Sequence, residues 1–194
     1  FGVGTGSTFD TLAIFAGGGT VTDTSGIEQD ELRIESVGSV TLDGDNDVIS
    51  LSARVTGNGS TLRFDDRDDL TITTVDTVAG VQTTGGAGTN NIAINAAETS
   101  AGALVVLQSV EASADGNIVL RTITAGSVIT LNATVSALGD QVVVRSAHNI
   151  VDSLNDSTDG TVRASEGLFS ALDQVGVLLN PISTALNNVA GQVT

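Results

Sequence analysis

The sequence contains no cysteine, lysine, methionine, tryptophan or tyrosine, and it has a single proline among its 194 residues. Without cysteine there is no disulfide framework and no thiol chemistry. The aromatic residues are five phenylalanines, 3% of the chain, so the core has to be thin and built from valine, isoleucine, leucine and alanine. Such a composition suits a narrow interior between strands better than a globular α/β domain.

Positive charge is also scarce. The chain has seven arginines against 23 aspartates and glutamates, which gives a formal net charge of −16. A polyanion of this strength repels nucleic acid and anionic lipid, so neither is expected as a partner. No apolar run approaches the roughly 18–20 residues of a membrane span, so no membrane insertion is expected within this chain. The excess charge either binds cations such as calcium or keeps a strand-rich surface solvated.

What the sequence does contain is a repeat. Short apolar, β-branched runs recur at a nearly constant interval, and a small polar turn lies in nearly every gap. In the best-ordered stretch the matching apolar positions are Ile94, Leu107, Leu120, Leu131 and Val144. Two runs make a repeat of about 24 residues, which predicts an all-β fold: a parallel β-helix, or β-solenoid, whose rungs hydrogen-bond along the axis. About eight such rungs make a rod roughly 40 Å long.

The repeat organises residues 1–194 as a single β-solenoid domain. Residues 1–35 are less regular and glycine-rich, and they are interpreted as an N-terminal rung or an assembly segment. Residues 36–164 hold the regular rungs, and residues 165–194 form a terminal rung or cap. The glycine- and threonine-rich residues 79–90 are expected to form a longer loop that protrudes from the stack.

Near the C-terminus the spacing of apolar residues changes. Intervals of four and three, typical of an amphipathic helix, separate Leu168, Leu172, Val175, Leu179, Ile182, Leu186 and Val189. Gly176 and Pro181 interrupt this stripe, which argues against one long helix. Asn180 can instead cap a short helix that begins at Pro181 and ends near Val189. The sequence therefore predicts either a short capping helix or continued strands.

Several phrases in the second half of the chain resemble a known family. They are residues 115–122 (DGNIVLRT), 126–129 (GSVI), 135–142 (VSALGDQV), 149–152 (NIVD), 160–164 (GTVRA), 175–177 (VGV) and 180–185 (NPISTA). These phrases are similar to the repeats of very large bacterial surface proteins, the filamentous-haemagglutinin-like and related β-strand-repeat proteins. The resemblance covers about residues 110–190 closely and 36–110 loosely. The family's unit often ends in G-I-G followed by N-P-L; here Val177 replaces the isoleucine, the second glycine is missing, and Ile182 replaces the leucine.

The resemblance implies a parallel β-helix on the outside of the cell, in an adhesin, a surface layer or a matrix fibre. It favours a non-enzymatic, extracellular structural protein that assembles end to end with copies of itself or with neighbouring repeats, because the end rungs of such a stack expose unpaired backbone groups. The alternative is an adhesin segment that binds a host or neighbouring-cell ligand through protruding loops, such as residues 79–90.

Three acidic segments are candidates for binding calcium, the one cofactor that the sequence indicates. The first two contribute Asp43, Asp45, Asp47, Asp65, Asp66, Asp68 and Asp69. In residues 43–47 the carboxylates alternate within a glycine-containing turn, so they can converge on one ion. The alternative is an acidic turn whose aspartates bond their own backbone. In the second segment Arg67 supplies compensating charge, and residues 155–160 form the third segment.

An enzyme is the least favoured interpretation, and no catalytic residue is expected. Some polysaccharide lyases and hydrolases are parallel β-helices, and they need paired carboxylates or a proton acceptor in a groove. Their sugar grooves usually carry tryptophan or tyrosine, and this chain has neither. His148 is the single histidine. Ser146 and Asp152 lie near it in the sequence, but a histidine in a turn is a simpler interpretation than a catalytic triad.

Overall fold

The computed structural model describes residues 11–113, 115–152, 162–176, 182 and 184–193. Within these residues the chain is all-β, with 19 strands and no helix. One large sheet contains 17 strands in parallel pairings, and β7 (Thr74–Val75) and β8 (Val78–Ala79) form a small antiparallel hairpin. The expected all-β class is therefore confirmed.

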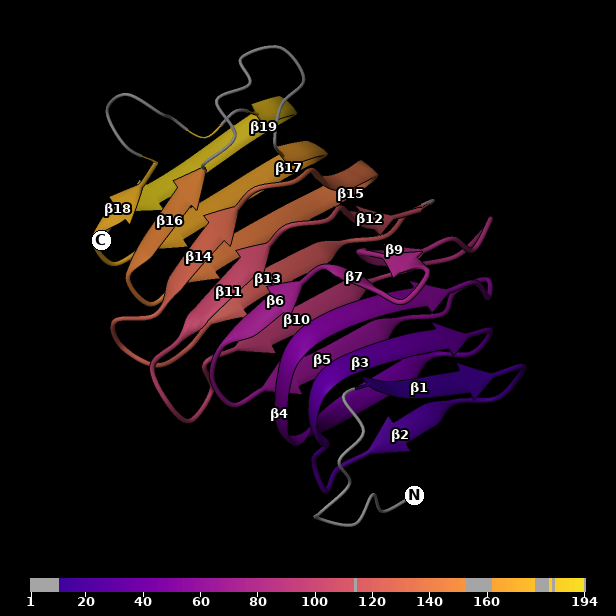
Figure 1. The fold of residues 1–194 in the computed structure, drawn as a ribbon. Coiled ribbons are helices and arrows are strands. Elements are labelled where there is room, and N and C mark those ends of the chain that lie inside the picture. Colours follow the sequence, from indigo (N-terminus) through magenta and orange to yellow (C-terminus); the bar gives the residue numbers. More distant parts are fainter. Residues whose placement is uncertain (1–10, 114, 153–161, 177–181, 183, 194) are drawn as a thin grey trace.

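The strands of the large sheet follow one another along the chain with short turns between them. They are β1 (Thr11–Ala16), β2 (Val21–Asp23), β3 (Glu28–Ser36), β4 (Val40–Val55), β5 (Leu62–Asp66), β6 (Leu70–Ile72), β9 (Val81–Thr83), β10 (Ile92–Ala96), β11 (Ala103–Val106), β12 (Val110–Ala112), β13 (Ile118–Thr122), β14 (Val128–Leu131), β15 (Val135–Ser146), β16 (Asn149–Asp152), β17 (Val162–Ala171), β18 (Gln174–Val175) and β19 (Thr184–Val193). In space they form a stack, with β1 and β2 at one end and β19 at the other (Figure 1).

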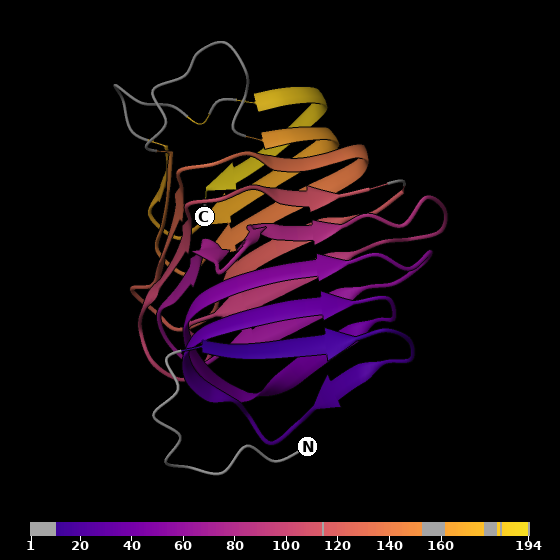
Figure 2. The ribbon, with the colours of Figure 1, turned by 45° about the vertical axis from the view of Figure 1, so that its right-hand side comes forward.

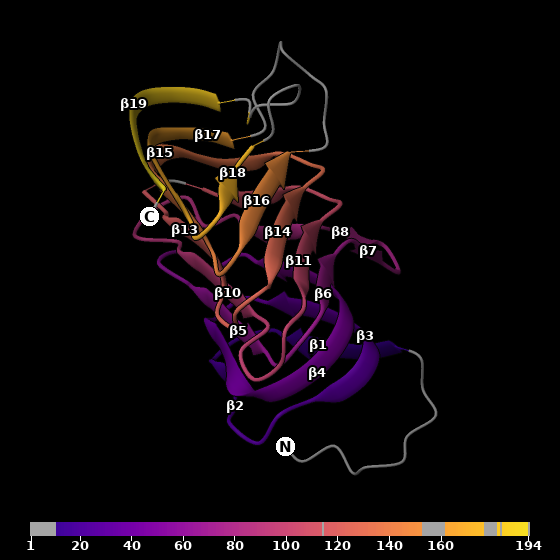
Figure 3. The same ribbon diagram turned by 90° about the vertical axis from the view of Figure 1, so that its left-hand side faces the viewer.

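Most strands pair with strands about one repeat away in the sequence, and these pairings form three rows. Row A is β2, β4, β5, β10, β13, β15, β17 and β19. Row B is β4, β6, β11, β14, β16 and β18, and Figure 3 shows most of it face on. Row C is β4, β9, β12, β15, β17 and β19. The rows stack their strands in chain order, from indigo to yellow in Figure 2.

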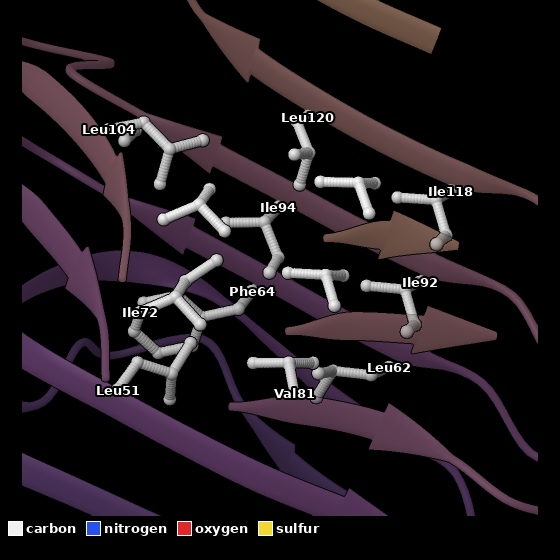
Figure 4. Packing of buried hydrophobic residues seen from close by; sticks show 14 of the residues in the cluster. Leu51, Leu62, Phe64, Ile72, Val81, Ile92, Ile94, Leu104, Ile118 and Leu120 are labelled. Atoms are coloured by element: carbon white, nitrogen blue, oxygen red, sulfur yellow. The ribbon is translucent and has the colours of Figure 1, made fainter. Parts of the chain in front are cut away.

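The core lies between the rows. Alternate residues of each strand point inward, as the two-residue period of a strand requires, and the buried apolar residues are almost all valine, isoleucine, leucine and alanine. In row A, Phe64, Ile94 and Leu120 stack on one another in register, beside Ile92 and Ile118 (Figure 4). Burying a side chain of this size stabilises the fold by roughly 1.5–3 kcal/mol. The expected thin aliphatic core is present.

The predicted repeat is found, with one position displaced. Ile94, Leu120 and Val144 pair in register along row A, on β10, β13 and β15. In row B the residue in register with Leu131 is Val106. The predicted Leu107 follows the end of its strand and is 44% exposed. The repeat is also less even than predicted: β3 and β4 are closer in sequence than β6 and β11, because the turns and loops between paired strands differ in length.

Residues 43–47 do not form the predicted turn between two strands. They lie inside β4, a strand of 16 residues, where the register with β5 shifts between Leu42 and Asn46. Such a bulge inserts residues without ending the strand. Gly44 is needed there, because a Cβ at this position would lie 2.5 Å from the backbone nitrogen of Gly26. The second acidic segment does include a turn, between β5 and β6.

Of the two alternatives for the C-terminal region, continued strands are found and the predicted helix is wrong. β19 pairs with β17 along its length, while Asn180 and Pro181 lie outside the described residues. In β17 the buried Phe169 and Ala171 follow the spacing of a strand. Leu172, part of the predicted helical stripe, is 61% exposed. The apolar residues at intervals of four and three therefore include outward and turn positions, and they do not form one buried helix face.

The loop expected at residues 79–90 begins later than predicted. Its first residues belong to β8 and β9, and the loop itself spans residues 84–91. Asn90 is fully buried, and its Nδ2 donates to the backbone carbonyls of Gly85 (3.1 Å) and Gly88 (3.0 Å). Hydrogen bonds from the Asn90 side chain to the loop backbone therefore hold the two ends of the loop together, and the tip of the loop is exposed.

Candidate functional site

Most of the acidic residues predicted to bind calcium lie at one corner of the stack. The bulge of β4 and the C-terminal end of β5 form this corner. Asn46, which the sequence does not single out, lies fully buried at its centre. Its Oδ1 accepts a hydrogen bond from the backbone nitrogen of Ile27 (2.9 Å). Its Nδ2 donates to three backbone carbonyls, of Leu42 (3.0 Å), Gly44 (3.3 Å) and Asp65 (2.6 Å). Buried polar groups need hydrogen-bond partners. The Asn46 side chain finds them in the backbone of the bulge itself and in the backbone of the chain segments on either side of it.

Asp66 occupies the matching position on β5, in register with Asn46. It is 1% exposed. Its Oδ2 accepts from the backbone nitrogen of Val48 (3.0 Å) and its Oδ1 from that of Asp68 (3.2 Å). Burial raises the pKa of Asp66 to about 7, although these two hydrogen bonds lower it; the charges of Asp68 and Asp47 raise it further. The corner therefore contains a buried carboxyl group that titrates near neutral pH.

Arg63 neutralises two carboxylates of row A. Its Nη2 lies 2.6 Å from Asp65 and its Nη1 lies 3.6 Å from Asp43. Asp65, whose side chain is 3% exposed, also accepts a hydrogen bond from Asn95 Nδ2 (2.7 Å). The hydrogen bond to Asp65 raises the pKa of Arg63. Asp65 is consequently a buried, fully partnered side chain.

Arg67 has the same role for the second pair of carboxylates. Its Nη2 lies 2.5 Å from Asp47 and its Nε lies 3.7 Å from Asp68. Burial raises the pKa of Asp47, and the charge of Arg67 opposes that shift. Asp69 is exposed and accepts from the backbone nitrogen of Ala103 (2.6 Å). The aspartates of this segment therefore bind arginine or backbone groups.

The structure thus brings the predicted calcium residues to one corner but gives most of them other partners. Asp45, which like Asp69 is exposed, is the exception. Within the described residues, no group of three or more His, Cys, Asp or Glu side chains is placed to hold a metal ion. Residues 155–160 lie outside that part of the chain. Calcium binding therefore stays a prediction.

Glu98 joins the corner from the far end of β10, and sequence reasoning missed it. Its backbone nitrogen donates to the carbonyl of Asp66 (3.1 Å). Burial raises the pKa of Glu98, as does the charge of Asp65, while Arg63 and Arg121 lower it. The only sequence signal is a carboxylate just after an apolar run, which is too common to identify a site. At this corner carboxylates are crowded beyond what Arg63 and Arg67 neutralise.

His148 does not lie in a triad. Its Nδ1 is 3.9 Å from an oxygen of Asp173, and both side chains are exposed to solvent. The Ser146 hydroxyl donates to the carbonyl of Ser127 (2.9 Å). A nucleophile needs a hydrogen bond to its base, and this serine hydroxyl bonds a backbone carbonyl.

A second feature is an apolar hollow of about 300 Å³ at the β1 end of the stack. Leu12 and Ile14 on β1 line it together with Val21 on β2, and these side chains are only partly buried. Their partners in the next strand, Leu32 and Ile34, are fully buried. The first strand therefore covers its neighbour but has no equivalent cover in the described structure.

Comparisons with protein-family models, with curated proteins and with solved structures gave no match. No helix within the described residues is long and apolar enough to cross a membrane.

Proposed function

We propose that the chain is a β-solenoid module of an extracellular structural protein, a building block of a fibre, surface layer or matrix that stacks end to end. Support for a solenoid comes from the repeated parallel pairing: successive strands of row A join segments that are 19 to 30 residues apart in the sequence. Each return of the chain adds one more set of inward-facing aliphatic side chains. The resemblance to bacterial surface repeats supports the extracellular location and a non-enzymatic role.

The observation that carries the proposal is the open end at β1. Within the described residues, β1 pairs with β3 and β2 pairs with β4, so one edge of each strand has no backbone partner there. The partly buried Leu12 and Ile14 lie beside that edge. Unpaired strand edges add further strands readily, and here an apolar hollow lies under the edge. Both features favour the addition of another parallel rung from a second copy or a neighbouring repeat.

Replacing Ala13 by proline tests this assembly. The carbonyl of Ala16 accepts from Val37 on the β3 side. Because backbone groups of alternate residues point to alternate sides of a strand, the N–H of the exposed Ala13 points to the free edge. Proline removes that donor. We expect end-to-end oligomers of the native chain in sedimentation velocity and negative-stain microscopy, and a shift of Ala13→Pro to monomers.

Ala13→Thr is the matched control, since it keeps the N–H and favours a strand. It should assemble like the native chain, and both variants should keep the native circular dichroism spectrum. A native chain that stays uniformly monomeric at high concentration would count against end-to-end stacking.

A binding role is the second candidate, favoured by two neighbouring loops. Gly86 donates to Asn58 Oδ1 (2.8 Å), and Gly59 donates to the carbonyl of Ala87 (2.9 Å). These contacts hold two exposed loop tips side by side on a rigid sheet, where binding surfaces often lie. Asn90→Ala removes the side chain whose hydrogen bonds hold the loop of residues 84–91 together. If adhesion is the function, beads coated with this variant should attach less to host or neighbouring cells, while end-to-end assembly is unchanged.

A further inference from the structure

The outer face of row A carries an uneven distribution of charge. Asp65, Asn95, Arg121 and Arg145 lie in register from β5 through β10 and β13 to β15. Asp65 is the buried member of this column and is bound by Arg63 and Asn95. On β4, the neighbour of β5 in row A, Asp43 lies at the start of the bulge. Along the stack this column passes from two carboxylates, through a neutral amide, to two guanidinium groups.

The two arginines are the unusual part of this column. The chain has 23 acidic residues and seven arginines, yet neither Arg121 nor Arg145 forms a salt bridge within the described part of the chain. The charge of Arg121 does reach Glu98 of its own chain and lowers the pKa of that carboxyl group. Both are exposed, and their strands are about 4.8 Å apart. Like charges opposite each other on adjacent strands destabilise a sheet. Carboxylates placed over this pair would remove the repulsion.

An apolar strip runs beside the arginines. The next outward column consists of Ala93, Val119, Val143 and Leu168, in register from β10 to β17. Outward positions of a sheet that faces water are usually polar, and Arg63 occupies the same column on β5. Val143 is 8% exposed and the other three side chains are partly buried, so this strip adds little exposed apolar area to the face.

We propose that the outer face of row A is a lateral interface between two copies of this chain that run in opposite directions. In row A, β5 and β13 lie on either side of β10, and the next strands outward are β4 beside β5 and β15 beside β13. A two-fold axis that runs parallel to the strands above β10 therefore places the charged column of one copy over the same column of the other copy in reverse order. Arg145 of each copy then lies over Asp43 of the other. In the neighbouring column, Val119 and Val143 lie over the polar residues of β5 and β4, Arg63 and Thr41. Arg121 lies over the corner at which Glu98 is the more exposed carboxylate, since Asp65 is buried. One surface supplies both halves of each contact, as a two-fold interface requires.

The contact is small. Seven strands about 4.8 Å apart and about five residues long cover roughly 500 Å² per copy, against about 800 Å² per partner in a standard interface. The pairing is therefore weak and reversible, and it depends on ion pairs that salt screens. It uses a different surface from the end-to-end contact at β1, so lateral pairs and longitudinal stacks can form independently.

Sedimentation equilibrium of the full chain tests the proposal, with Ala13→Pro present in every sample to prevent end-to-end growth. We expect dimers at about 0.1 M sodium chloride that dissociate at about 0.5 M. Arg145→Glu should weaken dimerisation by about tenfold or more. Arg54→Glu is the matched control: Arg54 is exposed, and it lies on another face, in register with Gln82 of β9. This control should change the dissociation constant by less than about threefold.

The charge-swapped chain with Asp43→Arg and Arg145→Glu supplies the decisive measurement. Asp43→Arg alone should weaken dimerisation, and the two changes together should restore most of it, since the reversed pair meets across the two-fold axis. A chain that stays monomeric at about 0.1 M salt overturns the proposal, as does an equal effect of Arg54→Glu and Arg145→Glu. A chain that stays monomeric and binds heparin through Arg145 also overturns the proposal, because the partner of this face would then be an anionic polymer.

Discussion

The free energy of unfolding should fall by about 2–3 kcal/mol as the pH rises from 5 to 8, chiefly because of Asp66. This carboxyl group is 1% exposed, and burial raises its pKa from 3.8 to about 7. The folded protein therefore holds the proton over a pH range in which the unfolded chain has lost it. Stability from this group is fully present below the unfolded pKa, and it is lost as the pH rises through the folded pKa.

Burial also raises the pKa of Asp47 and Glu98, so both act in the same direction as Asp66. The net charge of −16 adds general repulsion at high pH. The contribution of Asp66 therefore has to be separated from the effect of removing any one negative charge.

Asp66→Asn makes this separation. An asparagine can still accept the hydrogen bond from Val48 but no longer titrates, so the variant should lose at least half of the difference in unfolding free energy between pH 5 and pH 8. Asp45→Asn removes the same charge from an exposed position and should keep the native pH dependence. Urea denaturation of the three proteins at both pH values is the measurement. Equal flattening by both variants would assign the effect to net charge.

The periodic part of the fold could be predicted from the sequence, because burial imposes it. Ile94, Leu120 and Val144 recur at almost constant intervals, since each must fill the same place in the core. The displacement from Leu107 to Val106 arises because the register of a strand changes with the length of the turn beside it. The interval alone cannot show which of two adjacent apolar residues points inward.

The prediction of a helical stripe is wrong for a related reason. Intervals of four and three also arise when strands of period two are joined by turns, as at Leu168 and Leu172, the second of which is 61% exposed. Nothing local distinguishes such a pattern from a helix face. The parallel pairing of β17 with β19 decides it, and that contact is long-range.

The acidic residues show the limit of sequence reasoning more clearly. Seven aspartates stand out in the sequence as exposed candidates for calcium, but Asp65 and Asp66 are almost completely buried. Their burial depends on Asn46 and on the bulge in β4, which follow from contacts between two strands, β4 and β5, that no local pattern brings together. A run of aspartates reads as a polar turn unless those contacts are known.

The largest loss of stability is expected when Asn46 is replaced by aspartate, although the two side chains have nearly the same size. Asn46 is fully buried and its Nδ2 donates to three carbonyl oxygens. A carboxylate would present an oxygen to those carbonyls and place a second buried negative charge next to Asp66. An unpartnered buried charge costs about 3–5 kcal/mol. We expect Asn46→Asp to lower the free energy of unfolding at pH 8 by about 4 kcal/mol or more.

Asn46→Ala separates the charge from the lost hydrogen bonds. Alanine leaves the Ile27 nitrogen and the three carbonyls without their partner, at a cost of about 1–3 kcal/mol for an unmet buried group, whatever the pH. At pH 8 the aspartate variant should therefore be less stable than the alanine variant. At pH 5 it should recover, because a protonated carboxyl can donate one hydrogen bond and carries no charge. Thermal and urea denaturation at both pH values would show this reversal. An aspartate variant as stable as the native chain at pH 8 would mean that the corner opens to water.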